Sequence, residues 1–276
     1  MIFPHKSAAF ALLISAVAGI STAAADVQLS KLFGDHMVLQ QEKPIRIWGK
    51  ADAGEEVTVE FGGQSASAKA GADGRWRVDL EPMKADGVAH TMTVKGKNTV
   101  SLSDILLGEV WICSGQSNME WSVRASANPA EEIAAADHPR IRLFNVPGHV
   151  AKPEADDDPR GAWKVCSPQS VPDFSAVGYY FGREVHKNIG VPVGLVGTNW
   201  GGTRIEPWTP VVGFKQVPSL EDYVQSIESM DPASEAGKAL RSTYLDQVQG
   251  WLENSRAAVA EGKSFGKPPV LSTNPK

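Results

Sequence analysis

A change in hydrophobic periodicity near Asp104 constrains the fold of this chain more than any other feature of its sequence. Before that point apolar and polar residues alternate, as in EVTVEF at 56–61 and RWRVDL at 75–80. Turn residues such as Asp73-Gly74 separate these stretches. Alternation with a period of two between regular turns indicates short antiparallel strands with one buried face. We therefore predict an antiparallel β-sandwich-like domain over residues 26–104.

After Asp104 the apolar residues form nearly continuous runs, at Ile105–Leu107 and again at Val110–Cys113. Such runs are typical of strands that are covered on both faces, as in a parallel sheet. Further strands are predicted at 141–146 and 191–198, and helices at 130–136 and at 175–188, the latter with the apolar stripe Val177, Tyr180, Phe181 and Val185 and a stop at Gly190. Two or more helices, interrupted near Asp231-Pro232, are predicted between 219 and 261. Strands that alternate with helices predict an α/β domain with a mostly parallel sheet over residues 105–276.

Residues 1–25 have the pattern of a secretory signal peptide. Lys6 precedes the uncharged stretch 8–20, and the small residues 23–25 follow it. The apolar stretch is shorter than the roughly 20 residues that span a bilayer. We predict cleavage after Ala25 and a periplasmic or secreted protein without a membrane anchor, the alternative being a hydrophobic first strand or helix.

The composition of the chain bears on its partners, its cysteines and its capacity to bind metal. The formal net charge of −5 becomes −6 when Lys6 is lost, and there is no basic run, which argues against nucleic acid as a partner. Cys113 and Cys166 are too few for a disulfide scaffold, and their pairing stays open. The acidic stretch 153–160 is predicted to be a solvated loop, with a calcium site as the alternative. We predict no metal site, because the six histidines lack the spacing of zinc ligands, and we predict no cofactor.

Two loops follow predicted strands at the edge where ligands bind in open α/β sheets. One is Ser114–Asn118 and the other is Asn199–Thr203, and both are rich in glycine and small polar residues. Backbone N–H groups can face a ligand in such loops. Ser117 is a candidate nucleophile, although a polar turn is the alternative. Met119 stands where the G-x-S-x-G elbow requires glycine, which argues against a lipase-type α/β-hydrolase.

Several separated motifs together resemble the sialate O-acetylesterase family, a branch of the SGNH hydrolases. They occur in the expected order and span most of the chain after residue 25. The resemblance implies an SGNH-type three-layer α/β/α hydrolase domain that removes acetyl groups from sialic acid or from acetylated polysaccharide. The motifs are LFGDHMVLQ at 32–40, IWGKADAGEEVTV at 47–59, DGRWRVDL at 73–80, GEVWICSGQSNMEW at 108–121, FSAVGYYFGREV at 174–185 and VPVGLVGTNWGGTRIEPW at 191–208.

The resemblance implies that Ser117 attacks the acetyl carbonyl and forms an acetyl-enzyme, which water then hydrolyses. A serine hydroxyl needs a base to take its proton. The developing oxyanion needs N–H donors that already point at it. The resemblance assigns these donors to the Ser117 amide and to the amide of Gly201 or Gly202. The alternative is that the two glycines only form a tight turn.

The base that the resemblance implies is missing from this sequence. SGNH hydrolases take their base and its orienting acid from an Asp-x-x-His near the C-terminus, and no such motif occurs here. A Gln-Gly-Glu-Ser-like segment, the third oxyanion contributor, is also absent. We therefore predict a hydrolase domain that is incomplete at its C-terminus, with little or no ester hydrolysis by this chain alone. The alternative function is a non-catalytic carbohydrate-binding fragment.

Aromatic residues flank both loops and are candidates for stacking on a sugar ring. They are Trp121, Trp200 and Trp208, and each can equally pack in the core. An O-acetylated carbohydrate is the partner that these residues and the resemblance predict together.

Polar residues next to the loops are candidates for binding the substrate. Arg204 and Glu206 either hold substrate groups, including a sialic acid carboxylate on Arg204, or pair with each other, and we favour the pair. Asn118 either orients the turn or contacts substrate, and Gln116 is predicted to be structural.

Overall fold

The computed structural model describes residues 26–146 and 159–271. The predicted signal peptide and the residues 153–158 of the acidic stretch lie outside these described ranges.

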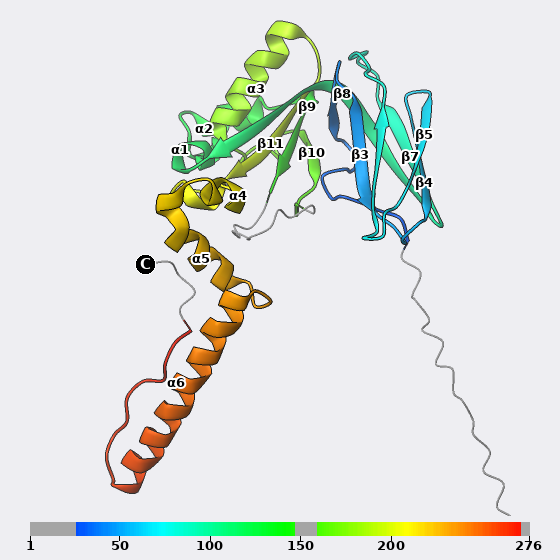
Figure 1. Ribbon diagram of the computed structural model, residues 1–276. Coiled ribbons are helices and arrows are strands. Elements are labelled where there is room, and N and C mark those ends of the chain that lie inside the picture. The colour runs from blue at the N-terminus through cyan, green and yellow to red at the C-terminus, as the bar shows by residue number, and fades with distance from the viewer. Residues whose placement is uncertain (1–25, 147–158, 272–276) are drawn as a thin grey trace, which may run out of the picture.

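The first part of the chain forms two antiparallel groups of strands that enclose one apolar core (Figure 1). The alternation predicted from the sequence is confirmed, because Val57, Val59 and Phe61 of one group are buried, as are Trp76 and Val78 of the other. The smaller sheet has the order β1-β3-β6, and β4, β5 and β7 belong to a larger sheet. The bounds are β1 Gln28–Leu29, β2 Val38–Gln40, β3 Ile45–Lys50, β4 Glu56–Phe61, β5 Gln64–Lys69, β6 Arg75–Leu80 and β7 His90–Lys95.

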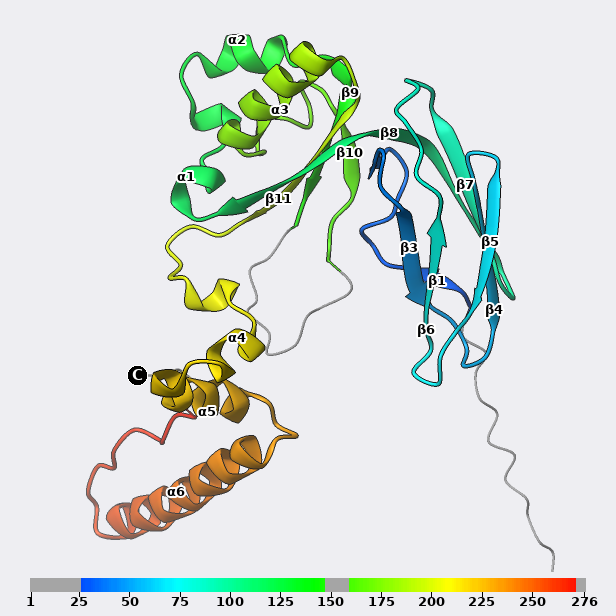
Figure 2. The same ribbon diagram turned by 45° about the horizontal axis from the view of Figure 1, so that its top comes forward.

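One long strand, β8 (Thr99–Gly115), joins this β part to the α/β part of the molecule (Figure 2). Its first half pairs antiparallel with β7, and its second half pairs parallel with β11 (Val193–Asn199). The boundary predicted at residue 104 therefore falls inside a continuous strand. Asp104 has a φ of 53° at that point, opposite a register shift in β7. A bulge of this kind bends a strand and increases its twist.

The α/β class is confirmed by the second part of the chain. The sheet continues from β8 through β11 to β9 (His138–Asn145), all parallel, and ends with the antiparallel β10 (Trp163–Cys166). Its helical elements are α1 Ser117–Glu120, η1 Val123–Ala125, α2 Pro129–Ala134, α3 Ala176–Ile189, η2 Glu206–Trp208, α4 Val211–Lys215, η3 Pro218–Leu220, α5 Glu221–Met230 and α6 Glu235–Ala260.

Helix α3 begins and ends where the sequence predicts. Ser175 caps it, since its Oγ accepts a hydrogen bond from the Gly178 N–H at 3.1 Å, and Gly190 ends it in the left-handed conformation with a φ of 72°. The interruption near residue 231 between α5 and α6 is likewise confirmed.

Glycines form the face of α3 that lies closest to the sheet. A Cβ at Gly178 would come within 2.8 Å of Cys113 Sγ, and one at Gly182 within 2.6 Å of a Leu195 methyl group. The helix lies too close to the strands for a larger side chain at either position. Val177 and Phe181 of the predicted apolar stripe are consequently 49% and 43% exposed.

The two faces of the parallel sheet are covered differently. Helices α1, α2 and α3 lie on one side (Figures 1 and 2). On the opposite side Phe144, Trp163 and Val196 pack into the same core as the β part. Farther along β8, Ile112 follows Val110 on this second face and is 72% exposed. In the described ranges this portion of the sheet therefore has no covering layer.

A partly buried ion pair ties the β part to the α/β part. Arg142 of β9, only 4% exposed, donates from Nη1 and Nη2 to the two carboxylate oxygens of Asp104, at 2.6 and 3.1 Å. His36 Nδ1 also lies 2.6 Å from Asp104 Oδ2. The hydrogen bond from Arg142 is the main reason why the pKa of Asp104 lies below its ordinary value.

Helices α4 to α6 extend away from the sheet, and α6 is the longest element of this arm (Figure 1). Among residues 26–146 and 159–271, no helix combines the length and the apolar character needed to cross a bilayer.

Candidate active site

Ser117 lies at the carboxyl end of β8, where the sequence predicts a ligand-binding edge. The strand ends at Gly115, whose φ of 142° suits glycine, and Ser117 begins the short helix α1 two residues later. The parallel neighbour β11 ends in register, with Asn199 opposite Gly115. Ser117 is solvent-exposed, so its hydroxyl is accessible to a substrate.

The structure brings the two predicted loops together. The Trp200 N–H donates to the Gly115 carbonyl at 2.9 Å, and Gln116 Nε2 donates to the Thr203 carbonyl at 3.2 Å. Gln116 therefore has the structural position that the sequence analysis predicts for it. Both contacts hold the loop after β11 against the loop that carries Ser117.

Of the two glycines, Gly201 is the one packed against Ser117. A Cβ at Gly201 would lie 3.6 Å from Ser117 Cα. A Cβ at Gly202 would meet no described atom within 4 Å. Gly202 adopts the left-handed conformation in the turn, with a φ of 74°. The Gly201 N–H donates to Glu120 Oε2 at 2.9 Å. Sequence reasoning missed Glu120, although its position one helical turn after Ser117 is a signal that could have identified it.

No general base contacts Ser117 in the described part of the chain. Its hydroxyl forms no hydrogen bond with any residue of 26–146 or 159–271, and the histidines there have other neighbours. Those neighbours are Asp104 for His36, Asp86 for His90, Tyr179 for His138 and the Val191 carbonyl for His186.

The three tryptophans that flank the loops have different environments, and Trp200 is partly buried. Trp121 is 58% exposed, with its Nε1 donating to the Ala125 carbonyl at 2.8 Å. Trp208 donates to Thr203 Oγ1 at 2.9 Å, and this hydroxyl in turn donates to the Trp200 carbonyl at 2.7 Å. Trp208 thus braces the loop after β11, whereas Trp121 presents its ring to solvent.

Arg204 and Glu206 follow the glycines and form only a loose ion pair. The Arg204 Nη1 to Glu206 Oε1 distance is 3.9 Å, and the Arg204 side chain is 85% exposed. Glu206 Oε2 is buried without a hydrogen-bond partner in the described residues. Asn118 is exposed next to Ser117.

The two cysteines lie in the core and are not nucleophiles of this site. Both are buried and unpaired. Burial raises the pKa of Cys113 to about 11 and that of Cys166 to about 12, which keeps them as thiols at neutral pH. Across the described ranges, no group of three or more His, Cys, Asp or Glu residues is arranged to hold a metal ion.

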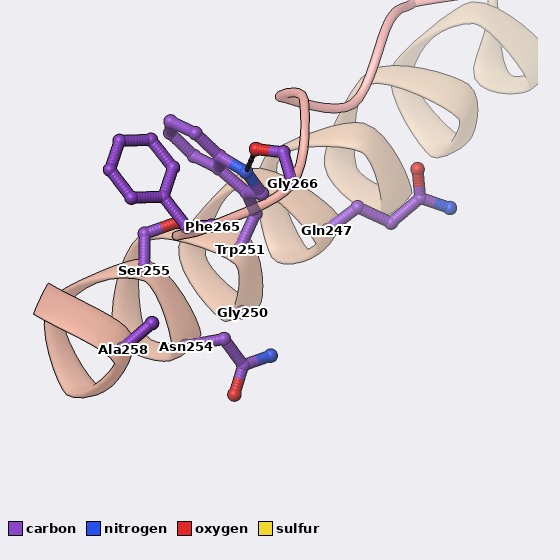
Figure 3. Close-up of a pocket in the computed structure, with 8 residues that line it drawn as sticks. All are labelled: Gln247, Gly250, Trp251, Asn254, Ser255, Ala258, Phe265 and Gly266. Carbon is purple, nitrogen blue, oxygen red and sulfur yellow. Dashed lines mark hydrogen bonds between the residues drawn. The ribbon is translucent and has the colours of Figure 1, made fainter. Parts of the chain in front are cut away.

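A separate groove of about 550 Å³ lies on α6, outside the Ser117 region (Figure 3). Trp251 and Phe265 lie side by side there, with ring centroids 6.0 Å apart, and Trp251 Nε1 donates to the Gly266 carbonyl at 2.8 Å. Ser255 Oγ is buried in this groove and lacks a partner among the described residues. The residues lining the groove include no ionisable side chain that could activate Ser255. The groove is therefore not a candidate catalytic site.

Comparisons with known proteins identify relatives among carbohydrate esterases. A family model described as carbohydrate esterase, sialic acid-specific acetylesterase, matches residues 107–250. The rat (Rattus norvegicus) sialate O-acetylesterase is 33% identical over 244 residues, which cover 80% of this chain and 45% of the rat protein. The human (Homo sapiens) sialate O-acetylesterase is 34% identical over 202 residues, which cover 66% of this chain and 38% of the human protein.

A solved structure has a similar fold. The crystal structure of a carbohydrate acetylesterase from Xanthomonas citri superposes with a TM-score of 0.65 and 34% identity, covering 69% of this chain and 44% of that one. The chain thus spans less than half the length of these relatives. Since the family model covers more than half of its residues, the chain belongs to the sialic acid-specific acetylesterase family of carbohydrate esterases.

Proposed function

We propose that the complete protein is a serine carbohydrate esterase that removes O-acetyl groups through an acetyl-enzyme on Ser117. The observation that supports this most directly is the exposed Ser117 at the carboxyl end of β8, packed against the Gly201 backbone. Donors fixed in advance around a developing oxyanion are typically worth ~10²–10³ each in rate. The Ser117 and Gly201 amides are the donors that this packing favours.

We further propose that polypeptide outside this sequence supplies the Asp and His of the triad. A general base must come within about 2.6–3.2 Å of the hydroxyl, and Ser117 has no such neighbour in the described ranges. The uncovered face of β8 around Ile112 is where the remaining layer of an SGNH-type three-layer domain would pack. In this proposal the β part is a sandwich-like domain that braces the hydrolase domain.

The proposed substrate is an acetylated sugar, either sialic acid or a polysaccharide unit. Trp121 offers an exposed ring to the sugar, and Trp200 lies within the same loop pair. Arg204 is exposed enough to pair with a carboxylate through two hydrogen bonds. An Arg204→Gln variant of the complete protein should therefore lose activity on acetylated sialic acid and keep it on acetylated xylan. Equal losses of activity on the two substrates would mean that Arg204 does not bind the carboxylate of sialic acid.

We also propose that the protein is exported after cleavage behind Ala25. N-terminal sequencing of the product secreted or released from the periplasm checks this directly. A mature protein that begins with Met1 would contradict it.

The experiment for the main proposal compares two forms of the protein. Residues 26–276 alone are expected to hydrolyse p-nitrophenyl acetate poorly, whereas the complete protein should turn it over and react with a fluorophosphonate probe at Ser117. Ser117→Ala should abolish both reactions, and Ser101→Ala is the matched control because it removes an exposed serine of the same strand outside the candidate loop. Robust turnover by residues 26–276 that depends on Ser117 would refute the proposal that the base lies outside this sequence.

One observation favours a second function for this chain, namely the absence of any base beside Ser117 in its described part. A non-catalytic carbohydrate-binding protein would retain sugar binding and never react with the fluorophosphonate. Unlabelled Ser117 in the complete, folded protein would therefore support this alternative over the esterase.

A further inference from the structure

The Gly201 amide already has an acceptor in the resting chain. Its N–H donates to Glu120 Oε2 at 2.9 Å, and Gly201 packs directly against Ser117. Glu120 lies three residues after Ser117 in α1, so the two side chains share one side of the turn. A carboxylate oxygen therefore already accepts a hydrogen bond from the amide that the proposed reaction would use to stabilise its oxyanion.

We propose that Glu120 is a positioning residue that fills the oxyanion position of the resting site, and that a small carboxylate such as acetate competes with it for the Gly201 N–H. The proposal rests on the proposed function only in identifying that amide as an oxyanion donor. It involves no covalent step, only the exchange of one acceptor oxygen for another.

The chemistry of the two acceptors explains why they would compete. A carboxylate oxygen and an oxyanion are both negatively charged acceptors, and both form short, charge-assisted hydrogen bonds with a backbone N–H. The two negative charges repel at close range, so Glu120 has to leave before an oxyanion can form there. Glu120 is solvent-exposed, and its side chain can therefore move into water.

The absence of a side chain at position 201 is what admits the carboxylate. A Cβ on Gly201 would overlap Glu120 Oε2, and Gly201 does not adopt a positive φ. Its backbone conformation is thus open to other residues, and a residue without a Cβ leaves room for the Glu120 carboxylate to approach the amide. Gly202 differs, because its φ of 74° itself favours glycine.

The test follows the Gly201 amide by NMR in the ¹⁵N-labelled full chain. Glu120→Ala should move the Gly201 proton resonance upfield, since its charged acceptor is lost. Titration with sodium acetate should then shift this resonance saturably, with an apparent affinity at least about tenfold stronger than in the wild type, as expected for one vacated hydrogen bond to a charged group. Glu132→Ala is the matched control, because it removes a carboxylate whose partner is Arg183, 2.6 Å away.

Two results would overturn the proposal. One is a Gly201 resonance that Glu120→Ala leaves in place, and the other is an equal response to acetate in variant and wild type. If Glu120→Ala fails to fold, Glu120→Gln keeps the size of the side chain and replaces the charged acceptor with a weaker neutral one, so it should also strengthen the acetate response, by less than Glu120→Ala. The readout involves no ester, and Ser117→Ala should not change it, so failure of the esterase proposal and failure of this one are distinguishable.

Discussion

The ion pair between Asp104 and Arg142 gives the most direct test of how the two parts of the molecule are joined. We expect Asp104→Asn to destabilise the chain strongly, because Arg142 stays buried after its counter-charge is removed. Asparagine tolerates the left-handed conformation that Asp104 adopts at a φ of 53°, so the substitution removes the charge without adding backbone strain.

The size of the effect follows from the burial of the two partners. Breaking a fully buried ion pair by removing one partner costs about 3–5 kcal/mol. The Asp104 side chain is 33% exposed, so water reaches it and lowers the cost to about 2–3 kcal/mol. The matched control is Asp79→Asn, whose partner Arg77 is bound through two hydrogen bonds but is 58% exposed. An exposed pair of this kind contributes about 0–1 kcal/mol.

Urea unfolding followed by tryptophan fluorescence measures both variants. With a slope of about 2 kcal/mol per molar, Asp104→Asn should lower the midpoint by about 1 M and the control by much less. The pKa of Asp104 is depressed, chiefly by the Arg142 hydrogen bond, so its stabilisation is present above the unfolded-state pKa and lost as the pH falls through the folded-state value. The difference from wild type should therefore shrink below about pH 4. Equal losses in the two variants, or a difference that persists at low pH, would refute this reasoning.

Three further predictions concern packing, capping and thiol reactivity. Gly182→Ala should lower the free energy of unfolding by about 1–3 kcal/mol, because its Cβ would collide with a leucine of β11. Gly250→Ala in α6 is the control, because its Cβ would meet no described atom, and it should raise the free energy of unfolding by up to about 1 kcal/mol. Urea midpoints measure both. Ser175→Ala removes the N-cap bond of α3 and should cost about 1 kcal/mol in the same assay; an unchanged midpoint would contradict the cap. Cys113 and Cys166 should not react with a thiol reagent at pH 8 until the chain unfolds, because burial raises the pKa of both; rapid labelling of the native chain would show that the core opens.

Local patterns in the sequence predicted much of the fold. The alternation at 56–61 and 75–80 identified the strands and their buried face, because the period of side chains along a strand is fixed. The helix predicted at 175–188, with a stop at Gly190, matches α3 to within one residue at each end, since helix ends depend on a few neighbouring residues.

Features that depend on distant partners could not be predicted in the same way. The continuity of β8 through Asp104 is set by its neighbours β7 and β11, which lie on either side of it in sequence. The packing face of α3 was also hidden, because Gly178 and Gly182 contribute no hydrophobic signal and are small only to allow close approach to the sheet.

The candidate site was predicted to a similar extent. Ser117 and the loop containing Gly201 were identified because both follow strands whose carboxyl ends share one edge. The bond from Gly201 to Glu120 could not be predicted, since it joins residues 81 positions apart and depends on how the two loops meet. These contacts belong to tertiary structure, which residue patterns along the chain do not report.

The geometry of β8 separates the stability of the chain from the chemistry of its site. Asp104 and Gly115 are 11 residues apart on this strand, a distance of about 36 Å at roughly 3.3 Å per residue. Substitutions more than about 10 Å apart without shared partners usually act independently. Asp104→Asn should therefore lower the urea midpoint and leave the Gly201 amide resonance where it is, whereas Glu120→Ala should move that resonance and leave the midpoint nearly unchanged. A shift of the Gly201 resonance in folded Asp104→Asn would instead mean that the bend in β8 sets the angle at which the strand presents Ser117.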